Sequence, residues 1–146
     1  MHINPLSPQV PTFDALLQTQ VFGRRATSGI FPTSGTYTPT LTNVTNLDAS
    51  TAYSCQYSQV GTVIVVSGKV DLDPTAAGLV QLGISLPIAS NLANANECGG
   101  VAFASGIAGQ GAAILGDATN NRAELDFIAV DTTNQPMYFV FQYRVI

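Results

Sequence analysis

Few residues of this chain could carry out acid–base, nucleophilic or metal chemistry. His2 is the only histidine, so a serine or cysteine nucleophile would lack a positioned imidazole base. Cys55 and Cys98 are too far apart in the sequence to form a zinc-ligand pair, and we expect two free, buried thiols. Asp71 and Asp73 share one face of a predicted strand and could form half of a calcium site or of an acid–base pair, but the other features of a calcium loop are missing. We therefore predict no catalytic residue, no cofactor and no metal site.

The glycine-rich residues 106–111 superficially resemble a phosphate-binding loop. Such a loop is followed by a helix, whereas residues 112–115 have the pattern of a strand that Gly116 ends. A hairpin or a β-bulge is therefore the better interpretation. Exposed tyrosines could instead stack on a sugar, but tryptophan is absent and alternation assigns Tyr53 and Tyr57 to the interior.

The composition is poor in charge: charged residues make up 10% of the 146-residue chain, against about 25% in an ordinary soluble domain. Because charged side chains are depleted where proteins meet, this composition favours assembly with other subunits. The net charge of −4 and the five scattered Lys and Arg residues argue against a nucleic-acid partner. No apolar run approaches the roughly 20 residues of a membrane helix, and the first residues lack the pattern of a signal peptide. We expect neither nucleic acid nor membrane as a partner.

Residues 1–34 differ in pattern from the rest of the chain and predict an extended arm with one short helix. Prolines at positions 5, 8 and 11 keep the first residues extended. A helix capped by Thr12 and ended by Gly23 should follow, with one apolar face made by Phe13, Leu16, Leu17 and Val21. A helix this short is stable only if its apolar face packs against another surface, either that of its own domain or that of another chain.

A basic pair, Arg24 and Arg25, precedes a linker rich in Ser, Thr, Gly and Pro at residues 26–35. The pair is either a solvated loop or an anchor on a negatively charged surface. We expect the linker to mark a boundary between the arm, residues 1–34, and a β domain, residues 35–146.

From Tyr37 onward the apolar residues recur with the period of β-strands. We predict about eight strands separated by turn signals, at residues 37–42, 53–58, 62–72, 82–86, 101–103, 112–115, 123–130 and 137–146. This spacing is typical of a β-sandwich or barrel, and the strand number fits a jelly-roll-like sandwich. The last strand also has apolar residues on its outer face, Tyr138, Val140 and Ile146, which predict either an oligomer interface or a covering loop.

Four segments of the β domain resemble modules of tailed-bacteriophage virion proteins. They are GTYTPTLTNVTNLDAS at residues 35–50, YSQVGTVIVVSGKV at 57–70, LGISLPIAS at 82–90 and MYFVFQYRVI at 137–146. The resemblance covers about three quarters of the chain. It implies a compact β-sandwich without a catalytic motif, often trimeric, carried on fibres or on capsids as a decoration (cement) protein.

The short leader favours the capsid over a long tail fibre, because roughly 30 extended residues reach at most about 110 Å. The expectation is therefore a non-enzymatic cement protein, made in the bacterial host cytoplasm, that forms a homo-oligomer, expected to be a trimer, on the outer surface of the virion. Its arm would bind the major capsid protein through Phe13, Leu16, Leu17, Val21, Phe22, Arg24 and Arg25.

Two alternatives remain open at this stage. The first is a receptor-binding head or tail fibre module that recognises a bacterial surface glycan. The second is a polysaccharide-degrading enzyme that uses Asp71, Asp73 or Glu97.

Overall fold

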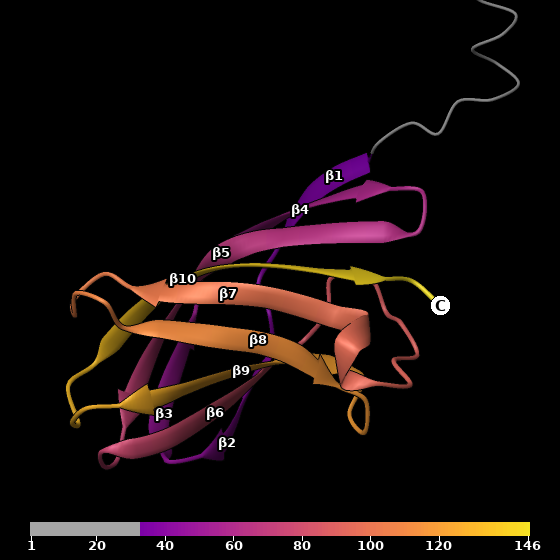
Figure 1. The fold of residues 1–146 in the computed structure, drawn as a ribbon. Coiled ribbons are helices and arrows are strands. Elements are labelled where there is room, and N and C mark those ends of the chain that lie inside the picture. Colours follow the sequence, from indigo (N-terminus) through magenta and orange to yellow (C-terminus); the bar gives the residue numbers. More distant parts are fainter. Residues whose placement is uncertain (1–32) are drawn as a thin grey trace, which may run out of the picture. The chain divides into compact units, whose positions relative to one another are not determined.

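The structure is a computed structural model that describes residues 33–146, and these residues form an all-β domain (Figure 1). Its strands are β1 (Thr33–Tyr37), β2 (Leu41–Thr45), β3 (Leu47–Ala52), β4 (Cys55–Val60), β5 (Val63–Pro74), β6 (Gly78–Ile84), β7 (Cys98–Ala104), β8 (Gly111–Asp117), β9 (Arg122–Ala129) and β10 (Gln135–Arg144). One 3₁₀ turn, η1 (Ala95–Glu97), precedes β7. The all-β prediction is confirmed, whereas the predicted arm and helix lie outside the described residues.

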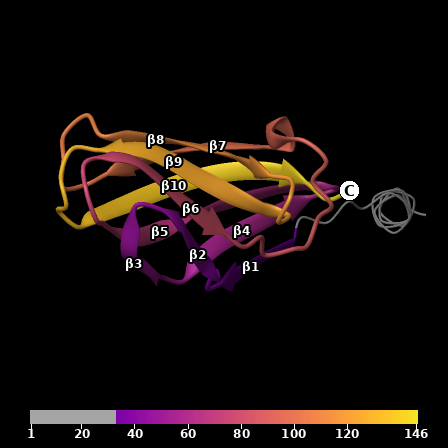
Figure 2. The same ribbon diagram turned by 90° about the horizontal axis from the view of Figure 1, so that it is seen from below.

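The strands form one antiparallel sheet in the order β1-β4-β5-β10-β7-β8-β9-β6-β2, and β3 pairs with β5. The consecutive strands β2 and β3 thus pair with β6 and with β5, which lie far apart along this order. Asn46, with a φ of 54°, makes the bend between them, a conformation that asparagine tolerates better than most residues. The change of partner lets the sheet curl over its own core (Figure 2).

Strands β6 to β9 form a Greek key. Hairpins join β7 to β8 and β8 to β9, and β6 lies beside β9 although a long connection separates it from β7. The glycine-rich residues 106–111 lie at the β7–β8 hairpin, as predicted. Gly61, with a φ of 62°, makes the two-residue turn of the β4–β5 hairpin, a position that favours glycine.

Ten strands are present where about eight were predicted. The predicted strand at residues 37–42 was wrong, because β1 ends at Tyr37 and β2 begins only at Leu41, after Pro39. Strand β3 was missed because its residues are mostly small or polar. Strand β1 begins at Thr33, so the sheet takes in two residues that the sequence pattern assigned to the arm.

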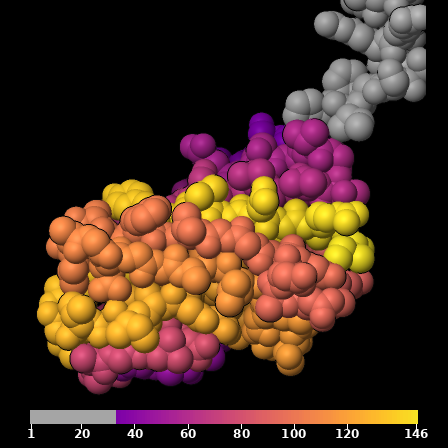
Figure 3. Space-filling model, viewed as in Figure 1, coloured from indigo at the N-terminus to yellow at the C-terminus, as the bar shows by residue number. Residues whose placement is uncertain are grey.

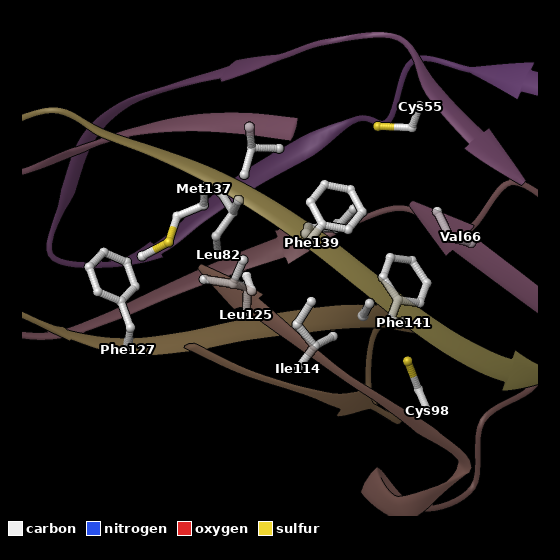
Figure 4. Packing of buried hydrophobic residues seen from close by; sticks show 14 of the residues in the cluster. Cys55, Val66, Leu82, Cys98, Ile114, Leu125, Phe127, Met137, Phe139 and Phe141 are labelled. Carbon is white, nitrogen blue, oxygen red and sulfur yellow. The ribbon is translucent and has the colours of Figure 1, made fainter. Parts of the chain in front are cut away.

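The core is built from alternate residues of the long strands. Four consecutive inward positions of β10 are filled by Met137, Phe139, Phe141 and Tyr143, and all four are buried. Figure 4 shows Phe139 and Phe141 beside side chains of the facing strands, and their rings stack at 5.7 Å. The predicted inner face of the last strand is therefore confirmed, and its outward residues are left on the surface.

Candidate functional site

The outer face formed by β10, β7, β8 and β9 is the most unusual surface of the described domain. These four strands lie side by side in Figure 1, and Figure 3 shows their outer surface in the same view. Large apolar side chains project from it, led by Phe103, Ile128 and Tyr138, which are 63%, 60% and 53% exposed. Ordinary monomers rarely expose a contiguous apolar patch of this kind.

The strand register orders this face into three rows that cross β10, β7, β8 and β9 in turn. The rows are Tyr138–Phe103–Gly111, Val140–Val101–Ala113–Asp126 and Gln142–Gly99–Leu115–Glu124. Ile128 is the next outward residue of β9 after Asp126, on the side of the first row. Leu79 of β6 extends the first row, because it lies opposite Ile128. We call these residues the outer face.

Two of the three residues predicted for an oligomer interface lie together on the outer face. Tyr138 and Val140 are neighbours on β10 and are both exposed. Ile146 is exposed as well, but it follows the end of β10, and the polar residues Gln142 and Arg144 separate it from the other two. The structure therefore does not bring Ile146 into the same apolar patch.

Several residues of the outer face were missed in the sequence. Val101, Phe103 and Ile128 alternate with buried residues on their strands, so their outward position was visible in the pattern. Their gathering into one patch was not, because it depends on the pairing of β7 with β10 and of β8 with β9.

Two carboxylates, Glu124 and Asp126, form the acidic rim of the outer face. Burial raises the pKa of both groups, and the negative charge of Asp126 raises the pKa of Glu124 further. Gln81 donates a hydrogen bond to Glu124 at 3.2 Å, whereas Oδ1 of Asp126 is buried without a hydrogen-bond partner. The rim is therefore costly to keep ionised.

A second cluster joins Tyr53, Lys69 and Asp71. The Tyr53 hydroxyl donates to Asp71 at 2.7 Å, Lys69 forms an ion pair with Asp71 at 3.0 Å, and the Lys69 ammonium lies 4.3 Å from the Tyr53 ring centroid. Burial raises the pKa of Asp71, but the bonds from Tyr53 and Lys69 outweigh it and the net pKa lies below the ordinary value. Asp71 is thus held as a paired carboxylate.

The prediction that Tyr53 is interior was wrong, because β4 begins at Cys55 and alternation does not extend back to position 53.

The three carboxylates considered for hydrolysis do not converge. Asp71 and Asp73 lie on the half of β5 that pairs with β3, and Asp71 is also opposite Pro136 of β10. Glu97 directly precedes Cys98, which is opposite Tyr143. The two places are therefore seven positions apart along β10, about 23 Å in an extended strand. Glu97 instead accepts a hydrogen bond from the N–H of Ala93 at 2.6 Å.

The two cysteines are free and buried, as predicted. Burial raises the pKa of Cys98 to about 12 and also raises the pKa of Cys55, so neither thiol has thiolate character at neutral pH. Within residues 33–146, no cluster of three or more His, Cys, Asp or Glu side chains could hold a metal ion. No helix in this described part is long and apolar enough to cross a membrane.

The residues predicted to bind a capsid, Phe13, Leu16, Leu17, Val21, Phe22, Arg24 and Arg25, lie outside the described residues. A scan against protein-family models finds no match for this chain, and a search of curated proteins finds no significant relative. The geometry of the outer face is therefore the main structural ground for a functional proposal.

Proposed function

We propose that this protein is a non-enzymatic structural component of a bacteriophage virion, a decoration (cement) protein of the outer capsid surface. In this proposal the β domain associates with further copies through the outer face, and residues 1–34 attach it to the major capsid protein. Attachment of an oligomer to several capsid subunits would stabilise the shell, because any ligand that binds only the assembled state favours that state.

The exposed outer face is the observation that carries the proposal. Tyr138, Val140, Val101 and Phe103 adjoin one another across β10 and β7 on the surface of a chain with only 10% charged residues. Burying apolar area contributes about 25 cal/mol per Å², so covering such a face favours association. The resemblance of four β segments to phage virion modules supports the biological setting. The Greek key of β6 to β9 further supports the jelly-roll-like sandwich that the strand number predicts.

Attachment is tested with a chain that lacks residues 1–31, since β1 begins at Thr33 and its pairing with β4 must be kept. We expect this truncated chain to self-associate like the full chain but no longer to bind phage capsids in a co-sedimentation assay. The double substitution of Leu16 and Leu17 by Asp in the full chain should give the same loss. Normal capsid occupancy by both variants would refute the role of the arm.

Recognition of a bacterial surface glycan is the second candidate, and one observation favours it. Tyr53 and Tyr138 are exposed, and the polar groups of Lys69 and Asp71 lie beside the Tyr53 ring. Aromatic faces next to polar groups suit sugars. Binding of the purified chain to a glycan array, lost on Tyr53→Ala, would favour this function over the first.

A further inference from the structure

The outer face alternates large and small side chains across its two central strands. In each of the three rows, a large residue of one strand lies opposite a small residue of the other. The pairs are Phe103 with Gly111, Val101 with Ala113, and Leu115 with Gly99. The face therefore has projections and hollows at matching positions on β7 and β8.

The hollows are open to the surface. A Cβ atom added at Gly99 would meet no atom within 4 Å, and one added at Gly111 would meet only the carbonyl oxygen of Ala102 at 3.7 Å. Ala113 is exposed. Each hollow can therefore accept a side chain from another molecule without any movement of the protein's own residues.

We propose that the outer face binds a second copy of this chain, related by a two-fold axis that runs parallel to the strands between β7 and β8. This inference rests on the proposed self-association and specifies its geometry. Such an axis places β7 of one copy over β8 of the other. Phe103 then enters the hollow over Gly111 of the second copy, Val101 lies over Ala113, and Leu115 lies over Gly99. Because the contact is isologous, every projection is used twice.

The neighbouring strands fit the same arrangement. The axis places Tyr138 of β10 over Ile128 of β9 in the second copy, which pairs two of the most exposed apolar residues. It places Gln142 over Glu124, where an amide can donate to the carboxylate. Only Val140 over Asp126 is unfavourable, because the Asp126 carboxylate loses water without gaining a partner.

The area of the face is sufficient for a stable contact. With the flanking strands β5 and β6 added to the four strands of the outer face, six strands at about 4.8 Å and three rows at about 6.8 Å give roughly 590 Å² in projection. Accessible area exceeds the projection wherever side chains stand up, so the face approaches the about 800 Å² per partner of a standard interface. Aligned sheet packings keep the strand directions of the two sheets within about 30° of each other, a range that includes this arrangement. A face filled by one second copy leads to a dimer, in place of the trimer that the family resemblance implies.

The central test exchanges a projection and a hollow within one row. Ala113→Val fills a hollow and Val101→Ala removes a projection, and each should weaken dimerisation of the full chain about tenfold or more in sedimentation equilibrium. The double variant restores a large residue opposite a small one, so its dimerisation should return to within about threefold of the unmodified chain. Ala49→Val, on the exposed side of β3, is the matched control and should leave association unchanged.

A second variant tests the face where folding is least affected. Gly99→Val adds atoms into open space in the single copy, and valine suits a strand, so the urea midpoint should not fall. Dimerisation should be lost because Leu115 of the second copy can no longer enter. In contrast, Asp126→Asn should strengthen dimerisation, since it removes the one carboxylate that gains no partner in the contact.

The outcomes separate the inference from the proposed function. A dimer restored by the double exchange supports both. A trimer or larger oligomer that Ala113→Val and Gly99→Val leave intact overturns the two-fold contact but keeps self-association. A chain that remains monomeric at high concentration overturns both.

Discussion

The hydroxyl of Tyr143 bonds to both main-chain polar groups of Ile88, donating to its carbonyl oxygen at 2.7 Å and accepting from its N–H at 3.1 Å. Tyr143 belongs to β10, whereas Ile88 lies in the long connection between β6 and β7. Ser90 of the same connection donates to the carbonyl oxygen of Arg144 at 2.7 Å. These bonds attach the connection of the Greek key to the end of the central strand.

Tyr143→Phe should therefore destabilise the domain. The change leaves two main-chain groups without their partner, which costs about 1–3 kcal/mol in the free energy of unfolding. Urea denaturation followed by circular dichroism measures the loss. Tyr138→Phe removes the same hydroxyl from an exposed tyrosine and should stay within about 0.5 kcal/mol of the unmodified chain. Equal effects of the two substitutions would contradict the role of the Ile88 bonds.

Gly68→Ala should be strongly destabilising, because an added Cβ would collide with the Cys55 side chain and come within 3.1 Å of Phe139. Overpacking of this kind costs about 1–3 kcal/mol and sometimes more. Gly99→Ala is the matched change at an open position and should be neutral or stabilising by up to about 1 kcal/mol. Thermal unfolding of both variants at low protein concentration compares the two sites directly.

The acidic rim should make folding stability depend on pH. The pKa values of Glu124 and Asp126 are raised on folding, so the native state binds more protons than the unfolded state. Stability contributed by these groups is present at low pH and is lost as pH rises from their ordinary values, 3.8 for Asp126 and 4.5 for Glu124, through the raised ones. Asp126→Asn should therefore raise the free energy of unfolding at pH 7, by less than about 1 kcal/mol because solvent screens a partly exposed charge.

Asp117 should show the opposite pH dependence. Burial raises its pKa, but hydrogen bonds from Asn120 and the ion pair with Arg122 at 2.8 Å outweigh this and lower the pKa overall. Its stabilising contribution is present above pH 3.8 and is lost as pH falls through the lowered value. Asp117→Asn should therefore lower the urea midpoint at pH 7 and have little effect in strong acid. A loss that is the same at every pH would point to a steric cause.

Both thiols should resist labelling in the folded protein. Cys55 and Cys98 are buried, and burial raises the pKa of Cys98 to about 12. Modification by a thiol reagent at pH 8 should proceed at the rate of unfolding, and denaturant should release two reactive thiols per chain. Rapid labelling of either residue without denaturant would contradict its position in the core.

The sequence predicted those parts of the fold that depend on local alternation. The inner residues of β10 and the exposed Tyr138 and Val140 follow from period-two patterning over ten consecutive residues. Strands β1 and β3 escaped prediction because small and polar side chains carry no such pattern, and their pairing with β4 and β5 determines their structure.

The candidate site was only partly predictable for a related reason. Phe103 and Gly111 are neighbours because β7 and β8 pair in one particular register. If one strand shifted by one residue, its outward side chains would lie on the inner face of the sheet. Tyr53 was misplaced because alternation was extended past the first residue of β4. Periodicity therefore identifies the outward residues of each strand, while the sheet order determines which of them form a surface.

Strand β10 lies between β5 and β7 and follows every other described strand in the sequence. During synthesis, β5 and β7 emerge from the ribosome long before the strand that joins them. The Greek key of β6 to β9 can therefore pair early, but the whole sheet cannot close until residue 144 has been translated. During that interval the edges of β5 and β7 that will pair with β10 are free, and the apolar core is exposed. The nascent chain must avoid association with other chains through these surfaces. We expect the synthesis of β10, rather than formation of the early hairpins, to determine when the native domain first exists.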